Sequence, residues 1–343
     1  MKVVTSLHHV DVRAQILKRV EQVALSGSYT EGMQLTEAET RIGTMYSCEA
    51  VGVNSAGAGL FALGSYLHDK GHTKVYVQNN TFVATASMMR AAGLYVWLVD
   101  SRHDCPSMSV DSLKEVVKKG GHGAVVLTHV GGWLAKDYEA IASFCKEQGL
   151  PLIVDGAHAF GVEGVAKYGL ATVFSFYPTK AVPIGEGGMV VTEDLDVYSW
   201  VYKFRNYGKY MAGHGMKYGP GFNLRMDEWS AAVLNVQLDR LPQILAARAA
   251  DAQKLMQIVP VKMPAGGTNW YKYPVSKRDA KDFQTVGAVY AHADQLLHAL
   301  PAFTQVVSLD NSTRWASEHV CLPMGEDLFH DMTMEEVRKM ICK

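Results

Sequence analysis

Residues 172–191 read TVFSFYPTKAVPIGEGGMVV, and this stretch predicts buried strand and turn. Lys180 stands in the middle of it, with Pro178 and Pro183 fixing the chain on either side. A lysine on a loop is usually exposed to solvent. The apolar flanks and the prolines favour another interpretation, in which Lys180 is held at a strand end in a partly desolvated site. Such a lysine has a lowered pKa and is a candidate Schiff-base nucleophile.

The pattern on either side of this stretch predicts the fold class. The expected strands are short, rich in valine and apolar on both faces, and they cover residues 50–54, 74–78, 95–99, 124–128, 152–155, 172–176 and 188–192. The expected helices between them cover residues 60–69, 82–92, 110–119 and 136–148, with Gly93, Gly120 and Gly149 as C-caps. This alternation predicts an α/β domain with a mostly parallel, doubly wound sheet.

The last third of the chain has a different pattern. Helices are expected over residues 227–258, with a break at Leu241-Pro242. A final helix is expected after Thr333-x-x-Glu336, which has the spacing of a capping box.

The length of the chain predicts two domains. A single compact core rarely extends over 343 residues. We therefore expect a large N-terminal domain over residues 1–245 and a smaller C-terminal domain over residues 246–343.

The composition limits the classes of function. The chain has 33 Lys and Arg against 34 Asp and Glu, a formal net charge of −1 at pH 7. This balance argues against a nucleic-acid or membrane-surface binder, because both need a concentrated basic field. The five cysteines are odd in number and none has CxxC spacing. We expect reduced thiols in a cytoplasmic protein, with no signal peptide and no membrane-spanning segment.

The segment after strand 50–54 could bind a phosphate. It reads Ser55-Ala56-Gly57-Ala58-Gly59 and leads into a helix. Small residues there would present backbone N–H groups and the positive end of the helix dipole to an anion. A tight turn packed against a neighbouring element is the alternative.

Two polar residues at the end of strand 152–155 complete the candidate site. Asp155 ends an apolar strand, where a carboxylate needs a partner such as a cationic ring nitrogen, a metal or a backbone cap. His158 by itself is more often structural, and two residues are too few for a metal site. A phosphate-binding turn, a buried Asp155 and a later Lys180 are the three parts that hold pyridoxal phosphate.

Several longer motifs resemble the DegT/DnrJ/EryC1/StrS aminotransferases, the fold-type I pyridoxal-phosphate enzymes of sugar-nucleotide metabolism. The strongest are VDGAHAFG (154–161), FSFYPTKAVPIGEGGMVVT (174–192), FRNYGK (204–209) and FNLRMDEWSAAVLNVQLDRL (222–241). Together with weaker matches they span nearly the whole chain. The resemblance implies a fold-type I transferase whose smaller C-terminal domain is also α/β and includes part of the N-terminal segment.

The resemblance assigns the residues that contact the cofactor. Lys180 is similar to the lysine that forms the Schiff base with pyridoxal 5'-phosphate, and Asp155 to the partner of the pyridinium nitrogen. His158 falls near the 3-hydroxyl of the cofactor. Phe82 matches the aromatic residue that stacks on the pyridine ring, and Ser175 resembles a hydroxyl that binds the phosphate.

Two further features concern the phosphate. Ala56-Gly57 stands where the family usually has Gly-Thr or Ala-Thr, so one hydroxyl is lost and backbone N–H groups would contribute more. Asn223 matches the asparagine that reaches the phosphate from the other subunit. The resemblance therefore implies a homodimer with shared active sites.

The implied reaction moves an amino group from an amino acid, L-glutamate in the family, to a keto sugar that is nucleotide-linked. A branch that instead removes a 3-hydroxyl has histidine at the position of Lys180, so Lys180 disfavours dehydration. Two alternatives stay open: a pyridoxal-phosphate lyase or decarboxylase of the same fold, and a non-catalytic regulator. The lysine, Asp155 and Ser175 argue against the regulator.

Overall fold

The large sheet contains all seven of the predicted strands. In this computed structural model the described residues are 10–212, 215–261, 266–279, 296–300, 302–322, 324–326 and 328–341. The strands of the large sheet are β1 (Glu49–Val53), β2 (Lys74–Gln78), β3 (Tyr95–Val99), β4 (Ala124–Thr128), β5 (Leu152–Asp155), β6 (Ala171–Ser175) and β7 (Gly188–Thr192). Their order is β1-β7-β6-β5-β4-β2-β3. Only β7 runs antiparallel to its neighbours, β1 and β6, so the prediction of a mostly parallel sheet is confirmed.

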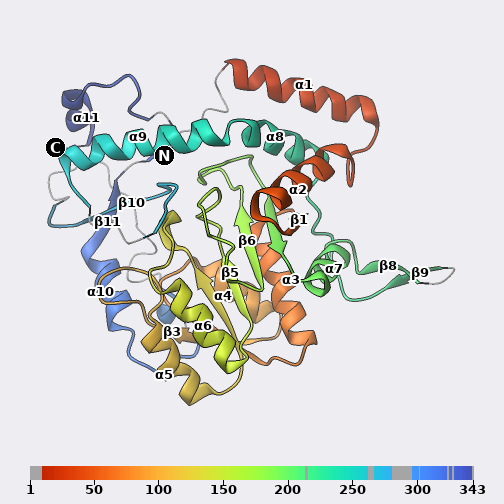
Figure 1. Cartoon of the computed structure of the whole chain (residues 1–343), viewed down its shortest axis with the longest axis horizontal. Coiled ribbons are helices and arrows are strands. Elements are labelled where there is room, and N and C mark those ends of the chain that lie inside the picture. The colour runs from red at the N-terminus through yellow and green to blue at the C-terminus, as the bar shows by residue number, and fades with distance from the viewer. Residues whose placement is uncertain are drawn as a thin grey trace.

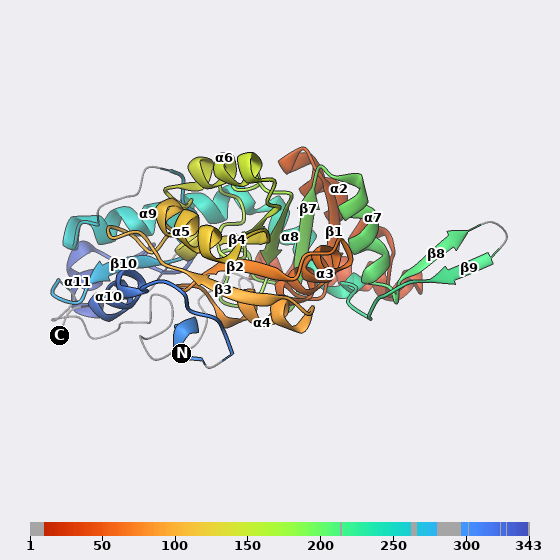
Figure 2. The same cartoon turned by 90° about the horizontal axis from the view of Figure 1, so that it is seen from below.

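Helices cover both faces of this sheet. They are α2 (Met33–Tyr46), α3 (Ala56–Asp69), α4 (Val83–Ala91), α5 (Val110–Gly120), α6 (Tyr138–Gln148), α7 (Leu195–Phe204) and α8 (Glu228–Asp239). Figure 2 shows α5 and α6 on one side of the sheet and α4 on the other. The N-terminal helix α1 (Val10–Ser26) packs against α8 (Figure 1).

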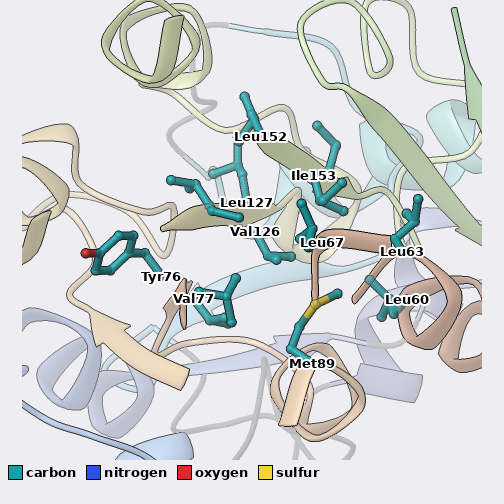
Figure 3. Packing of buried hydrophobic residues seen from close by; sticks show 14 of the residues in the cluster. Leu60, Leu63, Leu67, Tyr76, Val77, Met89, Val126, Leu127, Leu152 and Ile153 are labelled. Atoms are coloured by element: carbon teal, nitrogen blue, oxygen red, sulfur yellow. The ribbon is translucent and has the colours of Figure 1, made fainter. Parts of the chain in front are cut away.

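Alternating side chains of the strands enter two separate apolar clusters. Val173 and Val190 face α3 and join the larger cluster, whereas Phe174 and Met189 join a second cluster with α2 and α8. In Figure 3 the leucines of α3 gather with strand residues of the larger cluster. The α3 leucines are Leu60, Leu63 and Leu67, which repeat at helical spacing and are at most 2% exposed. Burial on both faces explains why the strands read as continuous apolar runs.

Several predicted helix ends were wrong: the C-cap of α4 is Ala92 rather than Gly93, and α6 begins at Tyr138 rather than at residue 136. Helix α3 begins at Ala56 rather than at residue 60, because Ser55 caps it and the small residues form its first turn. Gly120 lies inside α5, and the C-cap is Gly121 with φ +77°. Gly149 is the C-cap of α6 in the left-handed conformation, as predicted.

The C-terminal third has its own small apolar cluster. Helix α9 (Leu241–Ile258) follows α8 at the predicted break, and α11 (Met334–Ile341) begins after the predicted capping box of Thr333 and Glu336. The cluster lies among α9, α11 and a two-stranded sheet of β10 (Tyr273–Ser276) and β11 (His319–Leu322). Helix α10 (Asp310–Glu318) leads into β11.

The division into residues 1–245 and 246–343 remains a prediction. Its boundary falls within α9, which runs through residue 245 without interruption.

Of the five cysteines, Cys342 lies outside the described residues.

A hairpin extends from the body of the protein. It consists of β8 (Lys209–Ala212) and β9 (Gly215–Tyr218), and both views show it protruding beyond α7 (Figures 1 and 2). No described helix is both long and apolar enough to cross a membrane.

Candidate active site

The carboxyl ends of the strands meet around one cavity of about 340 Å³. Ligands of open α/β sheets bind at this edge, because the loops that follow parallel strands converge there. All but one of the predicted site residues line the cavity: Ala56, Gly57, Phe82, Asp155, His158, Ser175 and Lys180. We call the parts contributed by residues 55–57, 155–158 and 175–180 the strand-end wall.

The start of α3 is shaped to receive an anion. The Ser55 side chain accepts a hydrogen bond from the Ala58 N–H at 3.1 Å, so the cap is satisfied locally. Residues Ala56 and Gly57, which precede Ala58, line the cavity, and their N–H groups lie at the positive end of the helix dipole. Gly188 at the start of β7 is required here, because a Cβ on it would lie 2.6 Å from the Ala56 nitrogen.

Asp155 is a buried carboxylate with neutral donors. Its Oδ2 accepts from the Thr85 hydroxyl at 2.6 Å and its Oδ1 from the Ala157 N–H at 3.1 Å. Burial raises the pKa of Asp155, which these two bonds and the Lys180 ammonium partly offset. Within the described residues no cationic side chain pairs with it at ion-pair distance. A protonated ring nitrogen in the cavity would supply the missing partner, so the residue fits the predicted cofactor.

Lys180 lies on the turn between β6 and β7. Its backbone N–H donates to the Tyr177 carbonyl at 2.9 Å, which holds the residue at the mouth of the turn. Burial lowers the pKa of the Lys180 amine, while Tyr271 and Asp155 act in the opposite direction. The ammonium nitrogen lies 5.0 Å from the centre of the Tyr271 ring. A larger neutral fraction of the amine favours nucleophilic attack.

His158 is stacked on an aromatic residue from the other side of the cavity. Its ring lies 4.8 Å from the Tyr271 ring at an interplanar angle of 19°. Burial, together with the positive charges of Lys180 and Lys272, lowers the pKa of His158 well below its usual value. The lowered pKa favours the neutral form of the imidazole.

The remaining predicted residues have different surroundings. Phe82 is the N-cap residue of α4, is 62% exposed and lines the cavity. Ser175 ends β6, and its hydroxyl accepts weakly from the Tyr177 N–H at 3.4 Å. Asn223 is exposed and lies outside the cavity, paired through its backbone with Asn206 at the base of the β8–β9 hairpin.

Sequence reasoning missed Thr85, Tyr271 and Lys272. Thr85 lies on α4 one turn after Phe82, and a buried hydroxyl on a helix is a weak signal in sequence. Tyr271 and Lys272 line the cavity but follow the sheet by some 80 residues, in a segment without a recognisable motif. Nothing local in the sequence could place them there.

A model of the DegT/DnrJ/EryC1/StrS aminotransferase family matches residues 10–342. The chain belongs to this family. It is therefore a pyridoxal-phosphate-dependent aminotransferase by family, and the predictions of fold type I and of pyridoxal phosphate as cofactor are confirmed.

Several solved structures are similar over almost the whole chain. The structure of DesI in the presence of its TDP-sugar product has 26% sequence identity and a TM-score of 0.79, covering 95% of this chain and 88% of DesI. The aminotransferase TlmJ from Streptoalloteichus hindustanus has 25% identity and a TM-score of 0.81, covering 95% of each chain. The E. coli GDP-4-keto-6-deoxy-D-mannose-3-dehydratase with bound hydrated PLP has 18% identity and a TM-score of 0.84, covering 99% of each chain, a likeness that shows the fold alone.

Proposed function

We propose that this aminotransferase moves an amino group from L-glutamate to a nucleotide-linked keto sugar, which yields the keto acid and an amino sugar. The proposal is supported by DesI, a relative at 26% identity that was crystallised with a TDP-sugar product. The observation that carries it is a lysine, Lys180, whose buried amine shares one cavity with Asp155 and the start of α3.

Five residues of the strand-end wall have roles in this proposal. Pyridoxal phosphate, when bound, supplies a carbonyl carbon for the imine and a ring that accepts an electron pair. The N–H groups of Ala56 and Gly57 would hold its phosphate, with the Ser175 hydroxyl beside them. Asp155 would keep its ring nitrogen protonated. The freed amine of Lys180 would take the proton from the Cα of the amino donor.

A sugar dehydratase is the second candidate, because the family fold also carries that reaction in the E. coli enzyme. In our proposal, the residue at position 180 decides between transamination and dehydration. A lysine amine can both bind the cofactor and move the proton. In the family that this chain resembles, the dehydratase branch has histidine at the position of Lys180. Lys180 therefore favours transamination.

We also propose that the active protein is a homodimer in which Asn223 completes the partner's site. Asn223 lies at the base of the β8–β9 hairpin, outside the cavity of its own chain. The hairpin and its flanks expose large apolar side chains, which a single chain leaves uncovered: Tyr207, Tyr210, Met211, Met216, Tyr218 and Phe222. A second copy of the chain would bury them.

The proposed function is tested by absorbance spectroscopy with added pyridoxal phosphate, before and after L-glutamate. We expect an imine band that glutamate converts to the amine form of the cofactor. Lys180→Ala should remove the imine band and lower turnover by more than about a thousandfold. Lys272→Ala is the matched control, because it removes a second lysine of the same cavity and should keep the band.

The other outcomes are equally informative. A band that disappears in Lys272→Ala and persists in Lys180→Ala would overturn the assignment of the lysine. A band that glutamate leaves unchanged would reject this donor and favour the lyase alternative.

A further inference from the structure

A second wall of the cavity is formed by Tyr271 and Lys272, which belong to residues 268–272, here called the 268–272 segment. Asn269 fastens it to the loop after β5, since its side-chain N–H groups donate to the carbonyls of His158 at 2.9 Å and Phe160 at 3.0 Å. The same side chain accepts from the Tyr271 N–H at 3.0 Å. Both donors and the acceptor of this buried amide are thus used to fix the backbone beside Tyr271.

A buried arginine holds the segment from the other side. Arg248 of α9 is 4% exposed and donates to the carbonyls of Asn269 at 3.2 Å and Trp270 at 2.9 Å. Trp270 adopts a left-handed backbone conformation with φ +54°, which costs energy for a bulky residue. Several independent contacts therefore enforce one conformation of the segment.

The product of this anchoring is the placement of Tyr271. Its ring is 8% exposed and lies between the two lysines of the cavity, 5.0 Å from the Lys180 nitrogen and 4.9 Å from that of Lys272. One face stacks on His158, and the hydroxyl is 3.2 Å from the Thr179 hydroxyl. Tyr271 thus contacts both functional residues, Lys180 and His158, from a wall that the cofactor motifs do not include.

We propose that Tyr271 is a positioning residue that holds the Lys180 amine and the His158 ring in their working positions. This inference rests on the proposed function, in which Lys180 is the reactive amine. The hydroxyl oxygen of Tyr271 would accept a hydrogen bond from the Lys180 amine, and the ring would prevent the imidazole from turning.

The charges around the pair give the direction of the effect. Burial raises the pKa of Tyr271, but the positive charges of Lys180 and Lys272 outweigh burial and lower it. In return, Tyr271 favours the charged form of Lys180, whereas Lys272 disfavours it. The other titratable or charged groups that contact these residues or line the cavity are Asp155, His158, Tyr177, Glu186 and Arg248.

Competitive acetylation of the full-length, cofactor-free protein measures this coupling directly. The acetylation rate of each lysine is followed by peptide mass spectrometry between about pH 6 and pH 11, a range that spans the usual pKa of lysine. In the wild type, Lys180 should react with a midpoint below the usual pKa of lysine. In Tyr271→Phe the midpoint of Lys180 should move to still lower pH, because the ring remains and the hydroxyl is lost.

Two further variants separate positioning from a general loss of structure. Lys272→Met removes the like charge, so the Lys180 midpoint should move in the opposite direction, to higher pH. Thr179→Val changes an exposed residue whose hydroxyl is 3.2 Å from the Tyr271 hydroxyl. It should give a smaller shift in the direction of Tyr271→Phe, and it keeps the test open if Tyr271→Phe folds poorly. Tyr177→Phe is the control with no shift expected.

The outcomes distinguish this inference from the proposed function. Equal Lys180 midpoints in the wild type, Tyr271→Phe and Thr179→Val would overturn the role of Tyr271. If the midpoints shift as stated while the wild type forms no imine band with pyridoxal phosphate, the proposed function fails and the coupling stands.

Discussion

The two walls of the cavity are built in different ways. The strand-end wall consists of residues at or shortly after the carboxyl ends of β1, β5 and β6, so the sheet itself brings Ala56, Asp155 and Lys180 together. The 268–272 segment leads into β10 of the small sheet and is joined to the large sheet by long-range hydrogen bonds: its backbone pairs with Gly131 and Gly132, and the side chains of Asn269 and Arg248 bond to further backbone groups. The comparison indicates that the sheet itself positions the proposed reactive residues. A few long-range hydrogen bonds position Tyr271, the residue that affects the pKa of Lys180.

The largest predicted effect is on turnover and concerns Asp155 in the strand-end wall. Asp155→Asn removes the charge that would stabilise a protonated ring nitrogen, and we expect turnover to fall by at least about a hundredfold. The same change should stabilise the cofactor-free protein at neutral pH by about 1 kcal/mol, because an ionised carboxylate is costly when buried. Turnover and urea unfolding measure the two effects.

The sign of the stability effect follows from the raised pKa of Asp155. The folded protein binds this proton more tightly than the unfolded chain, so the contribution of Asp155 to stability is lost as pH rises through the folded pKa. The advantage of Asp155→Asn should therefore shrink on acidification. Asp104→Asn is the opposite control, since Arg102 lowers the pKa of Asp104 and its loss should destabilise the protein at neutral pH. A less stable Asp155→Asn at neutral pH would contradict the argument.

A glycine where the two walls meet gives the next effect. Gly132 has φ +83°, and a Cβ there would collide with the Asn269 side chain and lie 2.8 Å from the His158 carbonyl oxygen. Gly164 has a similar φ of +78°, but its Cβ would meet only the Leu134 side chain at 3.8 Å. Gly164→Ala should cost about 1 to 2 kcal/mol for the left-handed backbone. Gly132→Ala should cost roughly 2 kcal/mol more, because the 268–272 segment must shift.

Chemical unfolding of both glycine variants measures this difference. The acetylation midpoint of Lys180 should move in Gly132→Ala and stay unchanged in Gly164→Ala. Equal stabilities of the two variants would mean that the walls are less tightly joined than the contacts of Asn269 imply.

The smallest effect sharpens the role of the α3 start. Ser55 caps α3 at the cavity, and Ser109 caps α5 through an equivalent bond to the Ser112 N–H, remote from it. Replacing either serine by alanine should cost about 1 kcal/mol of stability. Only Ser55→Ala should also weaken the binding of pyridoxal phosphate, which equilibrium titration of the cofactor measures. Equal cofactor affinity in both variants would show that the first turn of α3 does not bind the phosphate of the cofactor.

Much of the site could be predicted because its residues obey local rules. The strands around Asp155 and Lys180 are recognisable from valine-rich runs, and a polar residue after such a run lies at the sheet edge. The beginning of α3 was placed four residues too late, since alanine and glycine at 56–59 resemble a turn until the Ser55 cap is seen. Thr85 escaped notice because its partner, Asp155, is 70 residues away.

The sequence by itself determined the sheet, most of the residues that line the cavity and the family, because each depends on short apolar runs and on motifs of a few adjacent residues. Only the tertiary structure decided that Tyr271 and Lys272 complete the cavity and that Asn223 lies outside it. The physical reason is that burial and charge act through space: the desolvation that lowers the pKa of Lys180, and the ring that moderates it, come from residues far apart along the chain.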